Sequence, residues 1–165
     1  MVRNVPVLCL VGFSGSGKTP LMEGLVRELS QEGYHVATVK HAHHGIELDR
    51  EGKDSWRHHQ AGAVVSIVSA PGSIAIFSRD QRELALDELC DQFARSVDLV
   101  LAEGYKETPH PKIVVLGNRP WSEAEWKGAR AVVADRPLKL DLPVFKSSDL
   151  ARIVNFIKDN FLSQQ

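Results

Sequence analysis

The sequence predicts an α/β protein in which helices cover both faces of a mostly parallel, doubly wound sheet, so that the chain forms three layers. Two observations support this prediction. A continuous apolar run at residues 5–11 is followed directly by a glycine-rich loop at residues 12–19 and an amphipathic segment at residues 20–33. A second apolar run at residues 35–39 then completes a βαβ unit, with the loop at its first turn.

The glycine-rich loop has the spacing of a P-loop, and its sequence is Gly12-Phe13-Ser14-Gly15-Ser16-Gly17-Lys18-Thr19. Its glycines permit a tight backbone path in which successive N–H groups point at phosphate oxygens, and the following helix adds its N-terminal dipole. Lys18 would bind the β- and γ-phosphates, and the Thr19 hydroxyl would ligate Mg²⁺. We therefore expect a P-loop NTPase fold, with phosphate bound by Gly12, Ser14, Gly15, Ser16, Gly17, Lys18 and Thr19.

The remaining chain continues the pattern of strands and helices. Runs at residues 63–68 and 73–77 flank Ala70-Pro71-Gly72, which predicts a hairpin that joins the sheet as its antiparallel element. Further strands are expected at residues 98–104, 112–116, 131–134 and 142–145. Helical faces are formed by Leu86, Leu89, Cys90, Phe93 and Val97, and by Leu150, Ile153, Val154, Ile157 and Phe161. Ser147 or Ser148 is the expected N-cap of the last helix.

The bulk composition limits the classes of partner. The net charge of −1 gives no electrostatic argument for binding nucleic acid or an anionic membrane. No apolar run has the length of a spanning helix, and no signal-peptide pattern opens the chain, so we expect a cytoplasmic protein. Cys9 and Cys90 lie in a strand and on a helix face, where packing roles are expected. Nothing marks a domain boundary, and we expect one domain over residues 1–165.

Glu103 is the expected metal partner of Thr19. In P-loop proteins a carboxylate at the end of a neighbouring strand holds Mg²⁺, and the run at residues 98–104 ends in Glu103-Gly104. Asp98, at the other end of that run, is interpreted as structural. Asp49 and Asp54 are the acids expected to assist Lys18 in catalysis, by orienting Mg²⁺ or an attacking water.

Residues 40–60 hold five of the seven histidines. Three interpretations of His41, His43 and His44 stay open. With Asp49 they would suit a transition metal, since imidazole binds zinc, nickel and copper. They would equally suit contacts with phosphate or a partner, or a solvated loop.

Base recognition is the least defined part of the sequence. The Asn-Lys-x-Asp motif of many GTPases is absent, and Asn118-Arg119 is only half of it. Asp135 follows the strand expected at residues 131–134. It is either an acceptor for guanine N1 and N2 or a turn acid, and both interpretations stay open.

Several blocks together resemble the MobB family, the molybdopterin-guanine dinucleotide biosynthesis adaptor proteins. They are the P-loop, Val39-Lys40-His41-Ala42-His43-His44, Gly52-Lys53-Asp54-Ser55 with Ala61-Gly62-Ala63, and Glu103-Gly104-Tyr105-Lys106. The resemblance implies a homodimeric P-loop protein that binds GTP with Mg²⁺, hydrolyses it slowly and assists the guanylyltransferase that attaches GMP to molybdopterin. It places phosphate on the P-loop and metal on Thr19 and Glu103. Pro20 and Gly45 depart from the family pattern, which has a hydroxyl residue and an acid there.

The sequence thus favours a GTP-binding adaptor with weak GTPase activity. Two alternatives stay open: a small-molecule kinase, and a metal-delivery GTPase that uses the histidine loop. A kinase would need an arginine-rich lid, whereas Arg119, Arg130 and Arg136 are scattered. No arginine lies near the P-loop in sequence, and an arginine finger accelerates hydrolysis by about 10³–10⁵-fold. We therefore expect slow hydrolysis, with such a group supplied by a second subunit or a partner.

Overall fold

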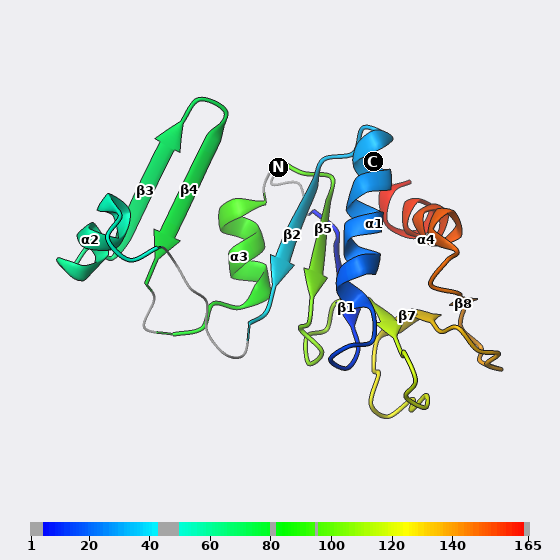
Figure 1. Ribbon diagram of the computed structural model, residues 1–165. Coiled ribbons are helices and arrows are strands. Elements are labelled where there is room, and N and C mark those ends of the chain that lie inside the picture. The colour runs from blue at the N-terminus through cyan, green and yellow to red at the C-terminus, as the bar shows by residue number, and fades with distance from the viewer. Residues whose placement is uncertain (1–4, 43–49, 80–81, 95, 164–165) are drawn as a thin grey trace. The chain divides into compact units, whose positions relative to one another are not determined.

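The computed structural model describes residues 5–42, 50–79, 82–94 and 96–163 (Figure 1). The chain divides into two compact units. The main unit comprises Met1–His41 and Leu86–Gln165, and the hairpin unit comprises Ala42–Ala85. That residues 1–165 form a single domain stays a prediction.

The described part of the main unit contains a six-stranded sheet with the order β2-β5-β1-β6-β7-β8. Its strands are β1 (Val7–Val11), β2 (Val36–Lys40), β5 (Leu99–Glu103), β6 (Lys112–Val115), β7 (Ala129–Val133) and β8 (Val144–Phe145). Each neighbouring pair runs parallel. β1 and β6 are buried along their whole length, because helices and loops cover both faces.

Two helices cover one face of this sheet. They are α1 (Lys18–Gln31) and α4 (Leu150–Ile157), which a π-helical turn at Lys158–Leu162 extends. α1 and α4 pack against each other, and Figure 1 shows them side by side. Their apolar stripes join the sheet in one core, with fully buried side chains that include Leu25, Leu29, Ile153 and Ile157.

The opposite face is covered by α3 (Leu86–Phe93) and by two irregular segments. Trp126 packs there from the connection between β6 and β7, and leucines 138, 140 and 142 pack from the segment before β8. The predicted three-layer α/β fold with a parallel, doubly wound sheet is therefore confirmed.

The ends of α1 follow from its sequence. Because the helix begins at Lys18, Pro20 is its third residue and falls in the first turn, where no intrahelical N–H bond is required. At the other end Gly33 has a φ of 92°. The N–H of Gly33 donates to the Ser30 carbonyl, and the N–H of Tyr34 donates to the Leu29 carbonyl. These two bonds form a Schellman motif, whose left-handed residue favours glycine.

The hairpin unit is built from α2 (Asp54–Gln60), β3 (Val65–Ala70) and β4 (Ser73–Ser78). The predicted antiparallel hairpin is confirmed, with Pro71-Gly72 as its two-residue loop. The prediction that it joins the main sheet is wrong, because β3 and β4 pair with each other as a separate two-stranded sheet. α2 packs on β3, and the buried His59 ring nitrogen Nε2 lies 3.2 Å from the Phe77 carbonyl oxygen.

The start of α4 also differs from the prediction. Asp149 occupies the N-cap position in place of Ser147 or Ser148. Its carboxylate accepts a bond from the Lys146 backbone N–H, at 3.3 Å. Ser147 contacts the Asp135 carboxylate instead.

Cys9 and Cys90 are free thiols, and burial raises the pKa of each. Both therefore stay protonated at neutral pH, in agreement with packing roles. In the part of the chain that the structure describes, no helix combines the length and apolar character that a bilayer-spanning segment needs.

Replacing Gly33 by alanine should lower the free energy of unfolding by about 1 kcal/mol, because a Cβ disfavours the left-handed conformation that ends α1. Urea denaturation followed by circular dichroism measures this change. Gln31→Ala, at an exposed position in the last turn of α1, is the matched control. Equal stability of the Gly33→Ala variant and the wild type would contradict the Schellman assignment.

Candidate phosphate-binding site

The P-loop connects β1 to α1 and passes very close to the end of β6. A Cβ built on Gly12 would lie 2.2 Å from the Val115 carbonyl oxygen and 2.8 Å from Ser16 Oγ, so only glycine fits there. Gly15 and Gly17 have φ angles of 75° and 95°. Side chains are disfavoured at both positions by backbone conformation alone. Glycine is therefore required by close packing at position 12 and by backbone conformation at positions 15 and 17.

Two side chains of the loop are arranged as a phosphate site requires. Lys18 folds back across the loop, and its ammonium group donates to the Phe13 carbonyl oxygen at 2.7 Å. Ser16 Oγ is buried and has no hydrogen-bond partner among the described residues. An unpaired buried hydroxyl is costly, and a phosphate oxygen would satisfy it. The loop therefore fits a phosphate ligand.

Thr19 and Glu103 are brought together as the sequence predicts. The parallel pairing of β1 with β5 aligns Leu10 with Glu103, which puts the carboxylate at the edge where α1 begins. The Thr19 hydroxyl donates to Glu103, with Oγ1 3.4 Å from Oε1 and 3.3 Å from Oε2. Lys40 Nζ lies 3.6 Å from Oε1. A hydroxyl beside a carboxylate is an oxygen donor set of the kind Mg²⁺ prefers.

The turn after Glu103 has an unusual backbone. Tyr105 has a φ of 57°, which is uncommon for a residue with a side chain. Its ring stacks on the His41 ring with centroids 5.0 Å apart. A Cβ on Gly104 would lie 3.2 Å from the His41 Cβ, so the turn packs closely on the end of β2. These contacts hold the wall of the site that carries Glu103 in place.

The other wall contains residues that the sequence analysis did not assign to the site. A cavity of about 350 Å³ lies between residues 13–16 of the P-loop and residues 116–119 after β6. The Arg119 guanidinium stacks over the Phe13 ring at 4.7 Å, and Phe13 packs edge-on against Trp126. Arg119 is far from the P-loop in sequence, and its partial match to a GTPase motif was the only signal that could have placed it.

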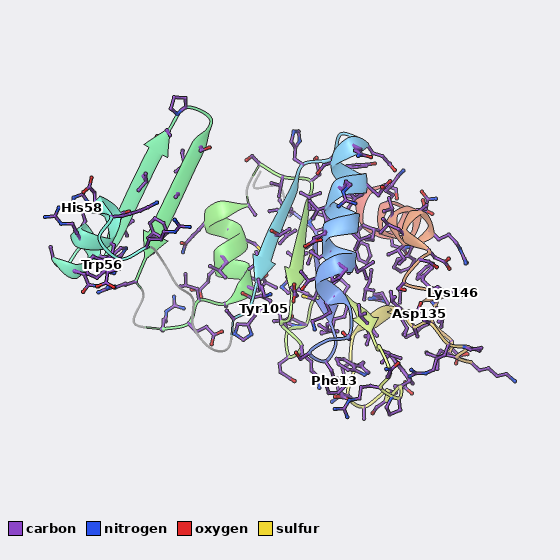
Figure 2. The ribbon with its side chains drawn as sticks, in the orientation of Figure 1. Phe13, Trp56, His58, Tyr105, Asp135 and Lys146 are labelled. Carbon is purple, nitrogen blue, oxygen red and sulfur yellow. The ribbon has the colours of Figure 1, made fainter. Side chains whose placement is uncertain are left out.

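Asp135 lies exposed at the end of β7, next to Lys146 at the end of β8 (Figure 2). Its carboxylate accepts a bond from the Ser147 backbone N–H at 2.8 Å, and the Ser147 hydroxyl lies 2.8 Å from Oδ2. The hydrogen bond from the Ser147 backbone N–H lowers the pKa of Asp135 most, and the bond from the Ser147 hydroxyl lowers it further. Its contacts thus tie β7 to the segment before α4, which supports the turn-acid interpretation.

Some of the predicted site residues lie outside the described part of the main unit. Asp49, His43 and His44 lie outside the described residues. Asp54 is the first residue of α2 in the hairpin unit, where its carboxylate complements the helix dipole. A catalytic role of Asp54 stays a prediction. The described residues contain no cluster of three or more candidate metal ligands.

Comparison with known proteins decides the family. The family model for molybdopterin guanine dinucleotide synthesis protein B, MobB, matches residues 7–135. The chain belongs to the MobB family. It is 37% identical over 163 residues to a molybdopterin-guanine dinucleotide biosynthesis adapter protein of Haemophilus influenzae, covering 96% of this chain and 91% of that protein. The corresponding adapter protein of Escherichia coli is 33% identical over 160 residues, with coverage of 93% and 91%.

Solved MobB structures share the fold. The crystal structure of Bacillus subtilis MobB matches with a TM-score of 0.81 and 30% identity, over 97% of this chain and 99% of that one. A MobB homolog from Bacillus stearothermophilus matches with a TM-score of 0.70 and 32% identity, over 94% and 97%. The MobB match at residues 7–135 includes the P-loop, Glu103 and Asp135.

Replacing Ser147 by alanine should raise the pKa of Asp135 toward its ordinary value, because the hydroxyl that stabilises the carboxylate is lost. The rise is partial, since the backbone N–H remains. A depressed carboxyl pKa contributes stability above the unfolded value of about 3.9, which is lost as pH falls through the folded pKa. NMR titration of the carboxyl carbon measures the shift. Ser148→Ala is the control, and equal titration in both variants would contradict the contact.

Proposed function

We propose that this chain is a GTP-binding adapter with weak GTPase activity, which assists the guanylyltransferase that converts molybdopterin cofactor to its guanine dinucleotide form. The observation that supports this most is the joint arrangement of Lys18, the unpaired Ser16 hydroxyl and the Thr19–Glu103 pair at one end of β1. The relatives named as molybdopterin-guanine dinucleotide biosynthesis adapter proteins support the proposed role in that biosynthesis. GTP, Mg²⁺ and the guanylyltransferase partner belong to the proposal.

In this proposal, phosphate binding and Mg²⁺ binding are assigned to different residues according to their chemistry. The N–H groups at the start of α1 and the Lys18 ammonium would bind the phosphates, and the Ser16 hydroxyl would donate to a phosphate oxygen. Thr19 and Glu103 would hold Mg²⁺, which supplies positive charge to the β- and γ-phosphates when bound. Lys40, whose Nζ lies 3.6 Å from Glu103 Oε1, would help to hold that carboxylate in position.

Slow turnover fits an accessory role. Of the arginines in the described chain, Arg119 stacks on Phe13 of the P-loop, so an arginine is close in space although none is close in sequence. It lies on the Ser14–Ser16 side, whereas the Thr19–Glu103 pair lines a different cavity, between α1 and β2. An arginine for the γ-phosphate would therefore come from a second subunit or the partner enzyme.

Replacing Lys18 by alanine should weaken GTP binding by about 10–100-fold, because a charge-assisted contact to phosphate contributes about 1.5–3 kcal/mol. Calorimetric titration with GTP, GDP and ATP in Mg²⁺ measures this, with Lys139→Ala, an exposed lysine outside the loop, as the control. GTP preference in the wild type supports the adapter proposal. Preference for ATP would favour the small-molecule kinase, and unchanged affinity in Lys18→Ala would contradict the phosphate role.

We also infer a homodimer, from the hairpin unit. Cross-strand pairing puts Val65, Ile67, Ile74 and Ile76 on one face of β3 and β4. These side chains are exposed by 50%, 64%, 70% and 47%. The other face carries Ser66, which is buried, and Phe77, which is half-buried. An isolated two-stranded sheet is marginally stable, and a second copy would cover the apolar face with an identical one.

Replacing Ile67 and Ile76 together by lysine should convert a homodimer to a monomer, because two charges would enter the centre of the apolar face. Sedimentation equilibrium of the full chain measures the mass. Ser73→Lys, exposed on the opposite face, is the control and should stay dimeric. A monomeric wild type would contradict the homodimer and leave this face for the partner enzyme.

A further inference from the structure

We propose that the cavity between the P-loop and residues 116–119 receives the nucleoside part of the nucleotide, its ribose and base. Arg119 is the contact residue for the base, and Arg136 is the positioning residue that holds the cavity wall. This inference rests on the proposed nucleotide-binding function. It adds a subsite and assigns it to residues other than Asp135.

The position of the cavity follows from the two ends of the phosphate site. Thr19 and Glu103 line a cavity of about 520 Å³ between α1 and β2, and this is the metal side. The second cavity, of about 350 Å³, is lined by Phe13, Ser14, Gly15 and Ser16 from the loop and by residues 116–119. A nucleotide with its terminal phosphate on the metal side therefore extends toward this second cavity. Its volume is within the range of small-molecule sites, about 300–1,000 Å³.

The chemistry of the cavity suits a base. The Arg119 side chain is exposed, and its planar cation already stacks on the aromatic ring of Phe13 at 4.7 Å. A guanidinium of this kind also stacks on the face of a heteroaromatic ring. Asn118 lines the same cavity, and its amide carries both a donor and an acceptor for a base edge.

Arg136 fixes the outer wall of the cavity. It follows Asp135 at the end of β7, and its side chain is half-buried. Nη1 donates to the Gly117 carbonyl oxygen at 2.8 Å, and Nη2 donates to the Arg119 carbonyl oxygen. One guanidinium thus bridges two carbonyls of the same loop, and its planar fork fixes their relative positions more rigidly than the single ammonium of a lysine would.

The clamped loop lies directly against the phosphate site. Gly117 has a φ of 55°, and a Cβ on it would lie 3.1 Å from the Ser16 Cα. A displacement of residues 117–119 would therefore change the wall next to Ser16. The Asp135 carboxylate, by contrast, is already hydrogen-bonded to Ser147. This contact connects the end of β7 to the segment before α4.

The test separates the nucleoside from the phosphates. Binding of GTP and of inorganic tripolyphosphate, each with Mg²⁺, is measured by calorimetry on the wild type, Arg119→Met and Arg136→Met. The matched control is Arg130→Met, an exposed arginine in β7 that does not line the cavity. Thermal melting of each variant checks that it is folded.

We expect Arg119→Met to weaken GTP binding by about 2- to 30-fold, the range from an exposed to a desolvated cation–π contact, and to leave tripolyphosphate binding unchanged. Arg136→Met should weaken GTP binding similarly without removing the cation that stacks on the base, and Arg136→Lys should not restore it. Arg130→Met should match the wild type for both ligands.

Other outcomes overturn the inference in distinguishable ways. Parallel loss of GTP and tripolyphosphate in Arg119→Met would make Arg119 a phosphate contact. Unchanged GTP affinity in both variants, or equal wild-type affinity for GTP and tripolyphosphate, would place the nucleoside elsewhere. If the wild type binds neither GTP nor tripolyphosphate, the proposed nucleotide-binding function is contradicted as well. The preceding outcomes contradict only the nucleoside subsite.

Discussion

The parallel pairing of β1 with β5 on one side and β6 on the other is the constraint on which the site depends. Parallel strands end at the same edge of a sheet, so this pairing puts Glu103 on one flank of the P-loop and Gly117 on the other. The loop itself can pass that close to β6 only because Gly12 has no side chain. One set of backbone hydrogen bonds therefore aligns the Thr19–Glu103 pair, the P-loop and the cavity beyond it.

Local signals in the sequence were sufficient to predict most of the strands and helices of the main unit. The P-loop, its preceding strand and the amphipathic helix are contiguous, and their physics is local: glycine conformation, helix dipole and apolar periodicity. The Thr19–Glu103 contact spans a long stretch of sequence, yet it was predictable because Thr19 lies at the start of the helix after β1 and Glu103 ends β5, and parallel strands end at the same edge of a sheet. The Schellman end of α1 and the tolerance of Pro20 likewise follow from neighbouring residues.

Contacts that depend on tertiary geometry were not predictable. Nothing near Ser147 indicates that its hydroxyl turns to Asp135 and leaves the cap of α4 to Asp149. The bridge from Arg136 to residues 117 and 119 exists only because β6 and β7 are neighbours. The hairpin was recognisable from its turn, but no local feature tells a strand whether it pairs with the main sheet or with its hairpin partner alone.

The edge-on packing of Phe13 against Trp126 has a spectroscopic consequence. Phe13 belongs to the P-loop, and its carbonyl oxygen accepts a hydrogen bond from the Lys18 ammonium group. Lys106 lies 4.7 Å from the centre of the Trp126 ring, so a cation sits against this indole. Indole emission responds to nearby charge and to the motion of its neighbours. The chain has three tryptophans, and Trp126 couples an intrinsic chromophore to the P-loop, giving a label-free optical record of loop rearrangement.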